Sequence, residues 1–66
     1  MKIIFNGESR VVTDEITVAD LLAEFNLTPR FVAVEVNEEL APRAGHKTHV
    51  LRDGDQVEIV TLVGGG

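Results

Sequence analysis

The chain is short and contains no cysteine, and these two features constrain its fold more than any other property of the sequence. A chain of 66 residues buries only about 60% of the surface that its unfolded form exposes. Without cysteine, neither disulfides nor a cysteine-based metal site can add stability. We therefore expect residues 1–66 to form a single domain around one well-patterned apolar core. A substrate cavity of roughly 300 Å³ would take much of that core, so the sequence argues against an enzyme that acts alone.

The charge balance is acidic, with 11 Asp and Glu residues against 6 Lys and Arg residues. Such a surface repels phosphate backbones and anionic lipid headgroups, so we expect neither nucleic acid nor membrane as a partner. The apolar run at Ile3–Phe5 is far shorter than a signal-peptide core or a membrane span. Together these observations predict a cytoplasmic protein.

The first part of the chain has the pattern of a β-hairpin. Lys2–Asn6 reads as a strand, and Asn6-Gly7 is the dipeptide that favours a type I′ turn, because both central residues need a positive φ. The segment Glu8–Thr13 then forms the return strand.

A helix is predicted to follow the hairpin. Thr17 precedes Asp20 by three residues, so its hydroxyl can cap an early amide while the acid lies near the positive end of the helix. Asn26 can close the helix, and Pro29 disfavours a helical residue before it. Apolar residues recur at spacings of three and four and form one stripe: Val18, Leu21, Leu22 and Phe25.

The second half of the chain is dominated by strand patterns, with β-branched residues that alternate with others. Pro42 cannot donate to a ladder and indicates a sheet edge. The expected elements are a strand at Phe31–Val36, a turn at 37–39, a short return strand at Leu40–Ala41, an irregular loop at 43–49, a turn at 53–55 and a strand at Gln56–Thr61.

This order of elements predicts an α+β domain in which one helix lies across one face of a sheet. Strict alternation directs four residues of the first and last strands toward the helix: Ile3, Phe5, Val57 and Ile59. The same alternation directs four others to the open face, where they form a candidate docking patch: Ile4, Glu58, Val60 and Leu62. Scattered surface apolar residues would give the same pattern. Between helix and sheet we expect Leu21, Leu22, Val34 and Ile59 to be buried.

The chain ends in three consecutive glycines, Gly64, Gly65 and Gly66, directly after an apolar strand. Glycine has the greatest backbone freedom and no Cβ, so a flexible tail of this kind can thread a narrow slot and present its carboxylate to another protein's active site. A frayed end or an expression scar would look the same. Because the chain has no cysteine, any sulfur function has to be added to it.

No other cluster of residues predicts a reactive site. His46 and His49 lie in the expected loop without a third ligand, so we interpret them as solvated and expect no metal. Glu38-Glu39 fits a polar hairpin tip better than a catalytic carboxylate pair. Ser9 has no histidine or acid at a convincing spacing, so we expect no catalytic residue.

Taken together, these motifs resemble the ThiS family of sulfur carrier proteins in thiamine biosynthesis over nearly the whole chain. The residues that carry the resemblance are Asn6-Gly7, Thr17–Leu22, Val32–Asn37, Pro42-Arg43, Asp53–Val60 and the terminal glycines. The resemblance implies a ubiquitin-like β-grasp fold, with a mixed sheet of four to five strands. It further implies that the first and last strands are parallel neighbours at the centre of that sheet.

The resemblance also implies a function for the tail. In the family an E1-like adenylating enzyme of the ThiF type uses ATP to convert the terminal glycine, here Gly66, into an acyl-adenylate. A persulfide donor then supplies sulfur, and a thiazole synthase of the ThiG type takes it from the resulting thiocarboxylate. Gly65 and Gly66 carry the diglycine of the family, and Gly64 precedes it. The chain would be a carrier without a bound cofactor of its own, and we expect a monomer.

Two alternatives remain at the level of sequence. The small subunit of molybdopterin synthase shares the fold and the thiocarboxylate, but its relatives often carry prolines before the glycines, where this chain has Thr61-Leu62-Val63. A β-grasp interaction module or protein modifier would never carry sulfur. The covalent fate of the tail separates the three.

Overall fold

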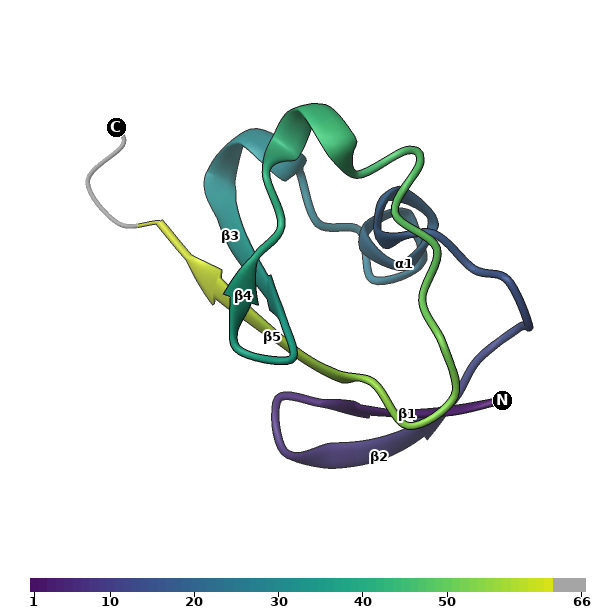
Figure 1. Ribbon diagram of the computed structural model, residues 1–66. Coiled ribbons are helices and arrows are strands. Elements are labelled where there is room, and N and C mark those ends of the chain that lie inside the picture. Colours follow the sequence, from purple (N-terminus) through teal and green to yellow (C-terminus); the bar gives the residue numbers. More distant parts are fainter. Residues whose placement is uncertain (63–66) are drawn as a thin grey trace.

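The computed structural model describes residues 1–62. These residues form one five-stranded sheet with a single α-helix packed on one side, as Figure 1 shows. The elements are β1 (Lys2–Phe5), β2 (Glu8–Val11), α1 (Val18–Glu24), β3 (Val32–Val36), β4 (Glu39–Leu40) and β5 (Gln56–Thr61), with short 3₁₀ helices η1 (Pro29–Phe31) and η2 (Arg43–Gly45). The predicted tail 64–66 lies outside the described residues.

The sheet is mixed, with the strand order β2-β1-β5-β3-β4. β1 and β5 come from opposite ends of the described chain and lie side by side in parallel, while the other three pairs are antiparallel (Figure 1). β5 is the central strand and is flanked by β1 and β3. The predicted α+β architecture and the parallel pairing of the first and last strands are therefore both confirmed.

Both hairpins turn through residues in the left-handed region. Asn6 has φ 47° and Gly7 has φ 84°, as a type I′ turn requires. In the second hairpin Asn37 and Glu38 have φ 53° and 69° and connect the directly paired residues at either side. The turn thus has two central residues instead of the predicted three, and the return strand begins at Glu39, one residue earlier than expected.

Helix α1 is closed at both ends by its own sequence. The Thr17 hydroxyl accepts a hydrogen bond from the Asp20 amide at 3.0 Å, and the Asp20 carboxylate accepts one from the Thr17 amide at 3.2 Å. At the other end Asn26 has φ 58° and its amide donates to the Ala23 carbonyl. The amide of the next residue, Leu27, donates back to the helix at 2.8 Å, which completes a Schellman motif. The predicted start and end signals are confirmed.

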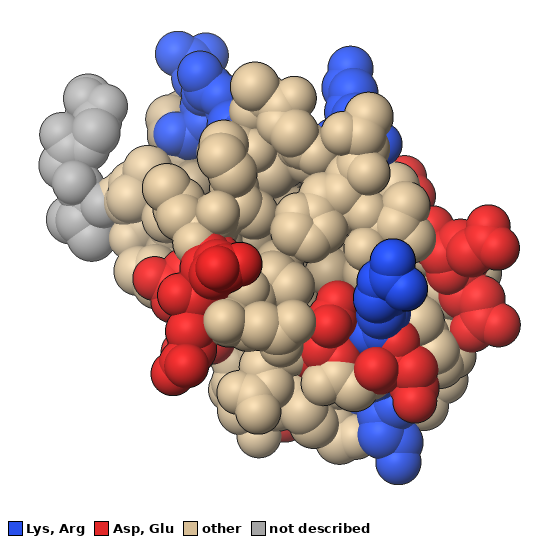
Figure 2. Space-filling view, viewed as in Figure 1, with Lys and Arg blue, Asp and Glu red and all other residues tan. Residues whose placement is uncertain are grey.

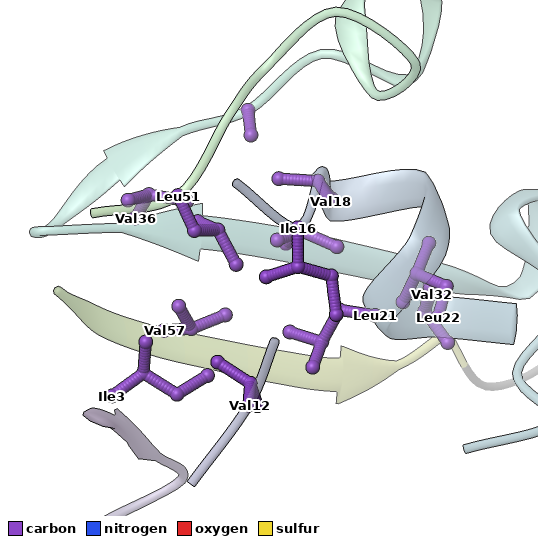
Figure 3. Packing of buried hydrophobic residues seen from close by; sticks show 12 residues of the cluster. Ile3, Val12, Ile16, Val18, Leu21, Leu22, Val32, Val36, Leu51 and Val57 are labelled. Atoms are coloured by element: carbon purple, nitrogen blue, oxygen red, sulfur yellow. The ribbon is translucent and has the colours of Figure 1, made fainter. Parts of the chain in front are cut away.

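The core lies between α1 and the inner face of the sheet, and Figure 3 shows Leu21 and Leu22 of the helix directed toward β5 and β3. Its buried members are Ile3, Val12, Ile16, Val18, Leu21, Leu22, Val32, Val34, Val36, Ala41, Leu51 and Val57. Ile59 is only partly buried, contrary to the prediction. The reason is that β1 ends at Phe5, so within residues 1–62 no strand lies beside β5 on that side at Ile59.

The segment between β4 and β5 docks on the start of α1. Amides of the first helical turn donate to carbonyls of this segment: Val18 to His49 and Ala19 to His46, both at 3.0 Å. Part of the segment is the 3₁₀ helix η2, so the prediction of a wholly irregular loop at 43–49 is wrong. The free amides at a helix N-terminus need acceptors, and this requirement orders the segment.

Candidate functional site

The outer face of the sheet, which we define as the face turned away from α1, carries the four predicted patch residues. Val60 and Leu62 are 60% and 49% exposed, and Glu58 is exposed as well. Ile4 is half-buried between its strand neighbours on β2 and β5. Ile4 therefore offers less apolar surface than strict alternation suggested, while Val60 and Leu62 leave about half or more of their surface uncovered by the rest of residues 1–62.

The central position of β5 brings this patch next to the segment that leads out of the domain. Val60 lies opposite Ala33 of β3, whose small side chain leaves it uncovered. The Leu62 amide donates to the Phe31 carbonyl at 2.8 Å, which keeps the chain in the sheet as far as the last described residue. The apolar patch is thus held in a fixed orientation immediately before residues 63–66.

The outer face is also acidic. Glu58 lies directly opposite Glu35 of β3, and like charges opposite each other destabilise a sheet. Within residues 1–62 the two ion pairs involve other groups, the N-terminus with Asp14 and Arg10 with Glu8. Figure 2 shows one group of acidic side chains where β4 and β5 lie, and further acidic groups at the lower centre and the right edge of the view. A partner that covers this face has to bring apolar contacts together with compensating positive charge or donors.

Within residues 1–62 four further exposed apolar residues were missed from the sequence: Val11 (81% exposed), Leu40 (66%), Phe31 (49%) and Val50 (47%). Leu40 pairs with Glu35, and Val11 pairs with Lys2, so both lie on the outer face. A two-residue turn at Asn37-Glu38, if predicted from the sequence, would have placed Leu40 opposite Glu35. Because Glu35 points outward, Leu40 would then have been predicted on the outer face. The outer face is therefore more apolar than the four patch residues alone suggested.

His46 is buried, with only 4% of its surface exposed, and its interpretation as a solvated loop residue is wrong. Its ring Nε2 lies 2.8 Å from the Ala41 carbonyl oxygen. A carbonyl can only accept, so Nε2 carries the proton. The backbone of His46 accepts from Ala19, and docking against the helix start draws the ring into the core.

The remaining candidates show no constellation for catalysis. His49 is half-buried, and Glu38 and Glu39 are exposed at the second hairpin, as predicted. Within residues 1–62 no three His, Cys, Asp or Glu side chains are grouped so that they could hold a metal ion. In the same range no helix is long and apolar enough to cross a membrane.

The described geometry therefore consists of a five-stranded sheet that exposes acidic and apolar residues on its outer face beside the end of β5. A family model described as the ThiS family matches residues 3–66. The chain belongs to the ThiS family. This match includes Gly64, Gly65 and Gly66, whose structure lies outside the described residues.

Individual ThiS-family relatives agree with this assignment. The chain is 29% identical to the sulfur carrier protein ThiS of Escherichia coli over 66 residues, which cover both chains completely. It is 42% identical to the thiazole synthase of Paramagnetospirillum magneticum, again over all 66 residues. The chain spans only 20% of that protein and 20% of a second thiazole synthase, from Magnetococcus marinus.

The fold is likewise that of a solved ThiS structure. The crystal structure of the thiamine biosynthesis protein ThiS from Geobacter metallireducens matches with a TM-score of 0.87 and 30% identity, over 100% of both chains. The predicted β-grasp fold is confirmed. The sequence-based identification as a ThiS-family sulfur carrier protein is confirmed too, and the family consists of carriers, not of enzymes.

Proposed function

We propose that this chain carries sulfur for thiazole formation in thiamine biosynthesis as a thiocarboxylate on Gly66. The observation that supports the proposal most is the family match, which extends to Gly66 in a chain without cysteine. The chain has no thiol that could hold sulfur or exchange with a thiocarboxylate. The terminal carboxylate is then the group at which sulfur is attached.

A carboxylate has to be activated before sulfur can replace one of its oxygens, because its delocalised charge makes the carbon a poor electrophile. We propose that a ThiF-type, E1-like enzyme adenylates Gly66 with ATP, which releases pyrophosphate and creates AMP as a leaving group. The terminal sulfur of a persulfide donor then attacks the acyl carbon and expels AMP, which leaves an acyl disulfide. A second thiol, which the donor or a small-molecule thiol supplies because this chain has none, reduces the S–S bond and releases the thiocarboxylate. ATP binding and acid–base catalysis belong to the enzymes, and the carrier supplies the reacting terminus.

We further propose a ThiG-type thiazole synthase as the acceptor of the sulfur. The two proteins named thiazole synthase each contain a segment that matches this whole chain, which supports a close functional link between carrier and synthase. The predictions of a cytoplasmic location and a monomeric state accompany this proposal.

The docking surface in this proposal is the outer-face patch of Ile4, Glu58, Val60 and Leu62. Val60 and Leu62 are exposed on the strand that leads to the tail. An enzyme that takes Gly66 into its active site has to approach this neighbouring surface. Ordering the tail costs about 1–2 kcal/mol per residue in backbone entropy, so contacts with the patch are needed to offset that cost.

Intact-mass measurement tests the proposed function. The protein is incubated with the adenylating enzyme, ATP, a persulfide donor and a thiol reductant, and we expect a mass increase equal to the replacement of one oxygen by sulfur. The matched control lacks Gly65 and Gly66 and should keep its mass. An isopeptide-linked product would instead identify a protein modifier, and an unchanged mass of the full chain would refute the carrier function.

A further inference from the structure

The central strand β5 is paired along its whole length on one side only. On the β3 side the pairing extends from Val57 to Thr61. On the other side β1 pairs only with Gln56 and Val57, because β1 ends at Phe5. The C-terminal half of β5 therefore has a side without a neighbouring strand in the part of the chain that the structure describes.

Asn6, the residue after β1, lengthens the hydrogen bonding on the β1 side of β5 by one residue pair. Its backbone amide donates to the Val57 carbonyl at 2.8 Å, and its side-chain Oδ1 accepts from the Ile59 amide at 2.8 Å. Its Nδ2 donates to the Ile59 carbonyl at 3.3 Å. The side-chain amide thus takes the place of a strand residue and satisfies both backbone groups of Ile59.

The next backbone groups on this side are those of Thr61. The Leu62 amide donates to Phe31 on β3, and the Gln56 carbonyl accepts from Asn37 at the same side. Even-numbered residues of β5 thus direct their amide and carbonyl toward β3, and odd-numbered ones direct theirs toward β1. The amide and carbonyl of Thr61 point past Asn6, where no strand within residues 1–62 pairs with them.

Apolar groups surround this open strand edge on both faces of the sheet. On the outer face Val60 and Leu62 are exposed on either side of Thr61. On the inner face Phe5 and Ile59 are only partly buried. An extended chain that paired with Thr61 would form backbone hydrogen bonds and would also bury apolar surface. Water can form the hydrogen bonds but buries no apolar surface.

We propose that an extended segment of the adenylating enzyme pairs with the open edge of β5 at Thr61 and continues the sheet where Asn6 ends it. An unpaired strand edge is a template for another extended chain. The occupant is recognised through its backbone, and it places an apolar side chain against Val60 and Leu62. This inference rests on the proposed function, because the enzyme that receives the tail is the protein brought beside β5.

The substitution Thr61→Pro tests the pairing selectively. Proline removes the Thr61 amide hydrogen and fills the open edge with its ring, but the β3 ladder uses no backbone group of Thr61. We expect unchanged circular dichroism and binding to the adenylating enzyme that is weaker by about tenfold. The control Thr61→Val keeps the amide and should bind as the unaltered chain does. Equal affinity of Thr61→Pro and Thr61→Val would overturn the proposal.

Hydrogen exchange at single amides provides a readout that does not depend on a variant, in case Thr61→Pro fails to fold. In the free protein the Thr61 amide should exchange fast and the Val60 amide, which faces β3, slowly. In the complex we expect Thr61 to become protected. Continued fast exchange of Thr61 in the complex would overturn the proposal, and so would protection in the free protein that grows with concentration, since it would show pairing between two copies.

The same measurements separate this inference from the proposed function. If the chain gains sulfur but the Thr61 amide stays unprotected in the enzyme complex, the proposed function stands and the edge pairing is refuted. If the chain neither binds the enzyme nor gains sulfur, both proposals are refuted.

Discussion

The side chain of Asn6 pairs with the backbone of Ile59 across 53 residues of sequence, accepting from its amide at 2.8 Å and donating to its carbonyl at 3.3 Å. The same Asn6 has φ 47° in the turn that joins β1 to β2. One residue thus shapes the first hairpin and anchors it to the central strand. Asn37 bonds the other end of β5 in a different way: its Oδ1 accepts from the Gln56 amide at 3.0 Å, its backbone amide donates to the Gln56 carbonyl at 2.7 Å, and its Nδ2 donates to the Asp55 carboxylate at 3.0 Å.

We predict that Asn6→Ala destabilises the fold by about 1–3 kcal/mol, because it removes both side-chain bonds and strains the left-handed turn. Denaturant unfolding measures the change. Asn6→Gly tolerates the positive φ but lacks the side-chain amide, so its loss of stability should be smaller than that of Asn6→Ala. If both variants unfold at the midpoint of the unaltered chain, the pairing with Ile59 does not stabilise the fold.

Leu22 on α1 is fully buried, and we predict that Leu22→Ala leaves much of the chain unfolded. A buried Leu→Ala change costs about 2–5 kcal/mol, and a chain of this size has a stability near the lower end of the usual range of about 5–15 kcal/mol. Thermal unfolding followed by circular dichroism measures it. The control Glu24→Ala changes an exposed residue of the same helix and should alter stability by less than about 0.5 kcal/mol. Similar melts for the two variants would contradict the described core.

Val60→Asp should weaken association with the adenylating enzyme by at least about 2 kcal/mol, the usual size of an interface hot spot. Thermal stability should change little, because Val60 is 60% exposed. Titration calorimetry compares it with Val11→Asp, which places the same charge on the outer face of the edge strand β2 and should bind normally. Loss of affinity in both variants would point to long-range charge repulsion instead of a patch at Val60.

Deletion of Gly65 and Gly66 should abolish adenylation without unfolding the protein, because residues 1–62 contain the whole described sheet. ATP–pyrophosphate exchange with the adenylating enzyme measures activation, and circular dichroism measures folding. Removal of a single glycine leaves a chain that still ends in two glycines but is shorter by about 3.3–3.6 Å, so it shows whether diglycine alone is sufficient. Undiminished exchange by the chain that ends at Gly64 would rule out the tail as the reacting group.

The elements that the sequence predicted correctly are those that depend on residues only a few positions apart. The Asn6-Gly7 turn requires positive φ at two adjacent residues, and the caps of α1 use Thr17, Asp20 and Asn26 within their own turns. Alternation along β5 placed Val57 in the core and Val60 on the outer face. The parallel pairing of the first and last strands came from the family resemblance, and the full strand order came from the structure, because no local pattern shows which distant strands pair.

Tertiary structure alone decided the features that depend on distant partners. His46 is buried because its backbone accepts from Ala19, 27 positions earlier in the chain, at the start of the helix. Ile59 is only partly buried because β1 ends at Phe5, and the open edge at Thr61 has the same origin. The periodicity of apolar residues predicts the face of the sheet to which a side chain points. Whether another strand covers it is decided by the lengths and registers of strands that meet only in the folded chain.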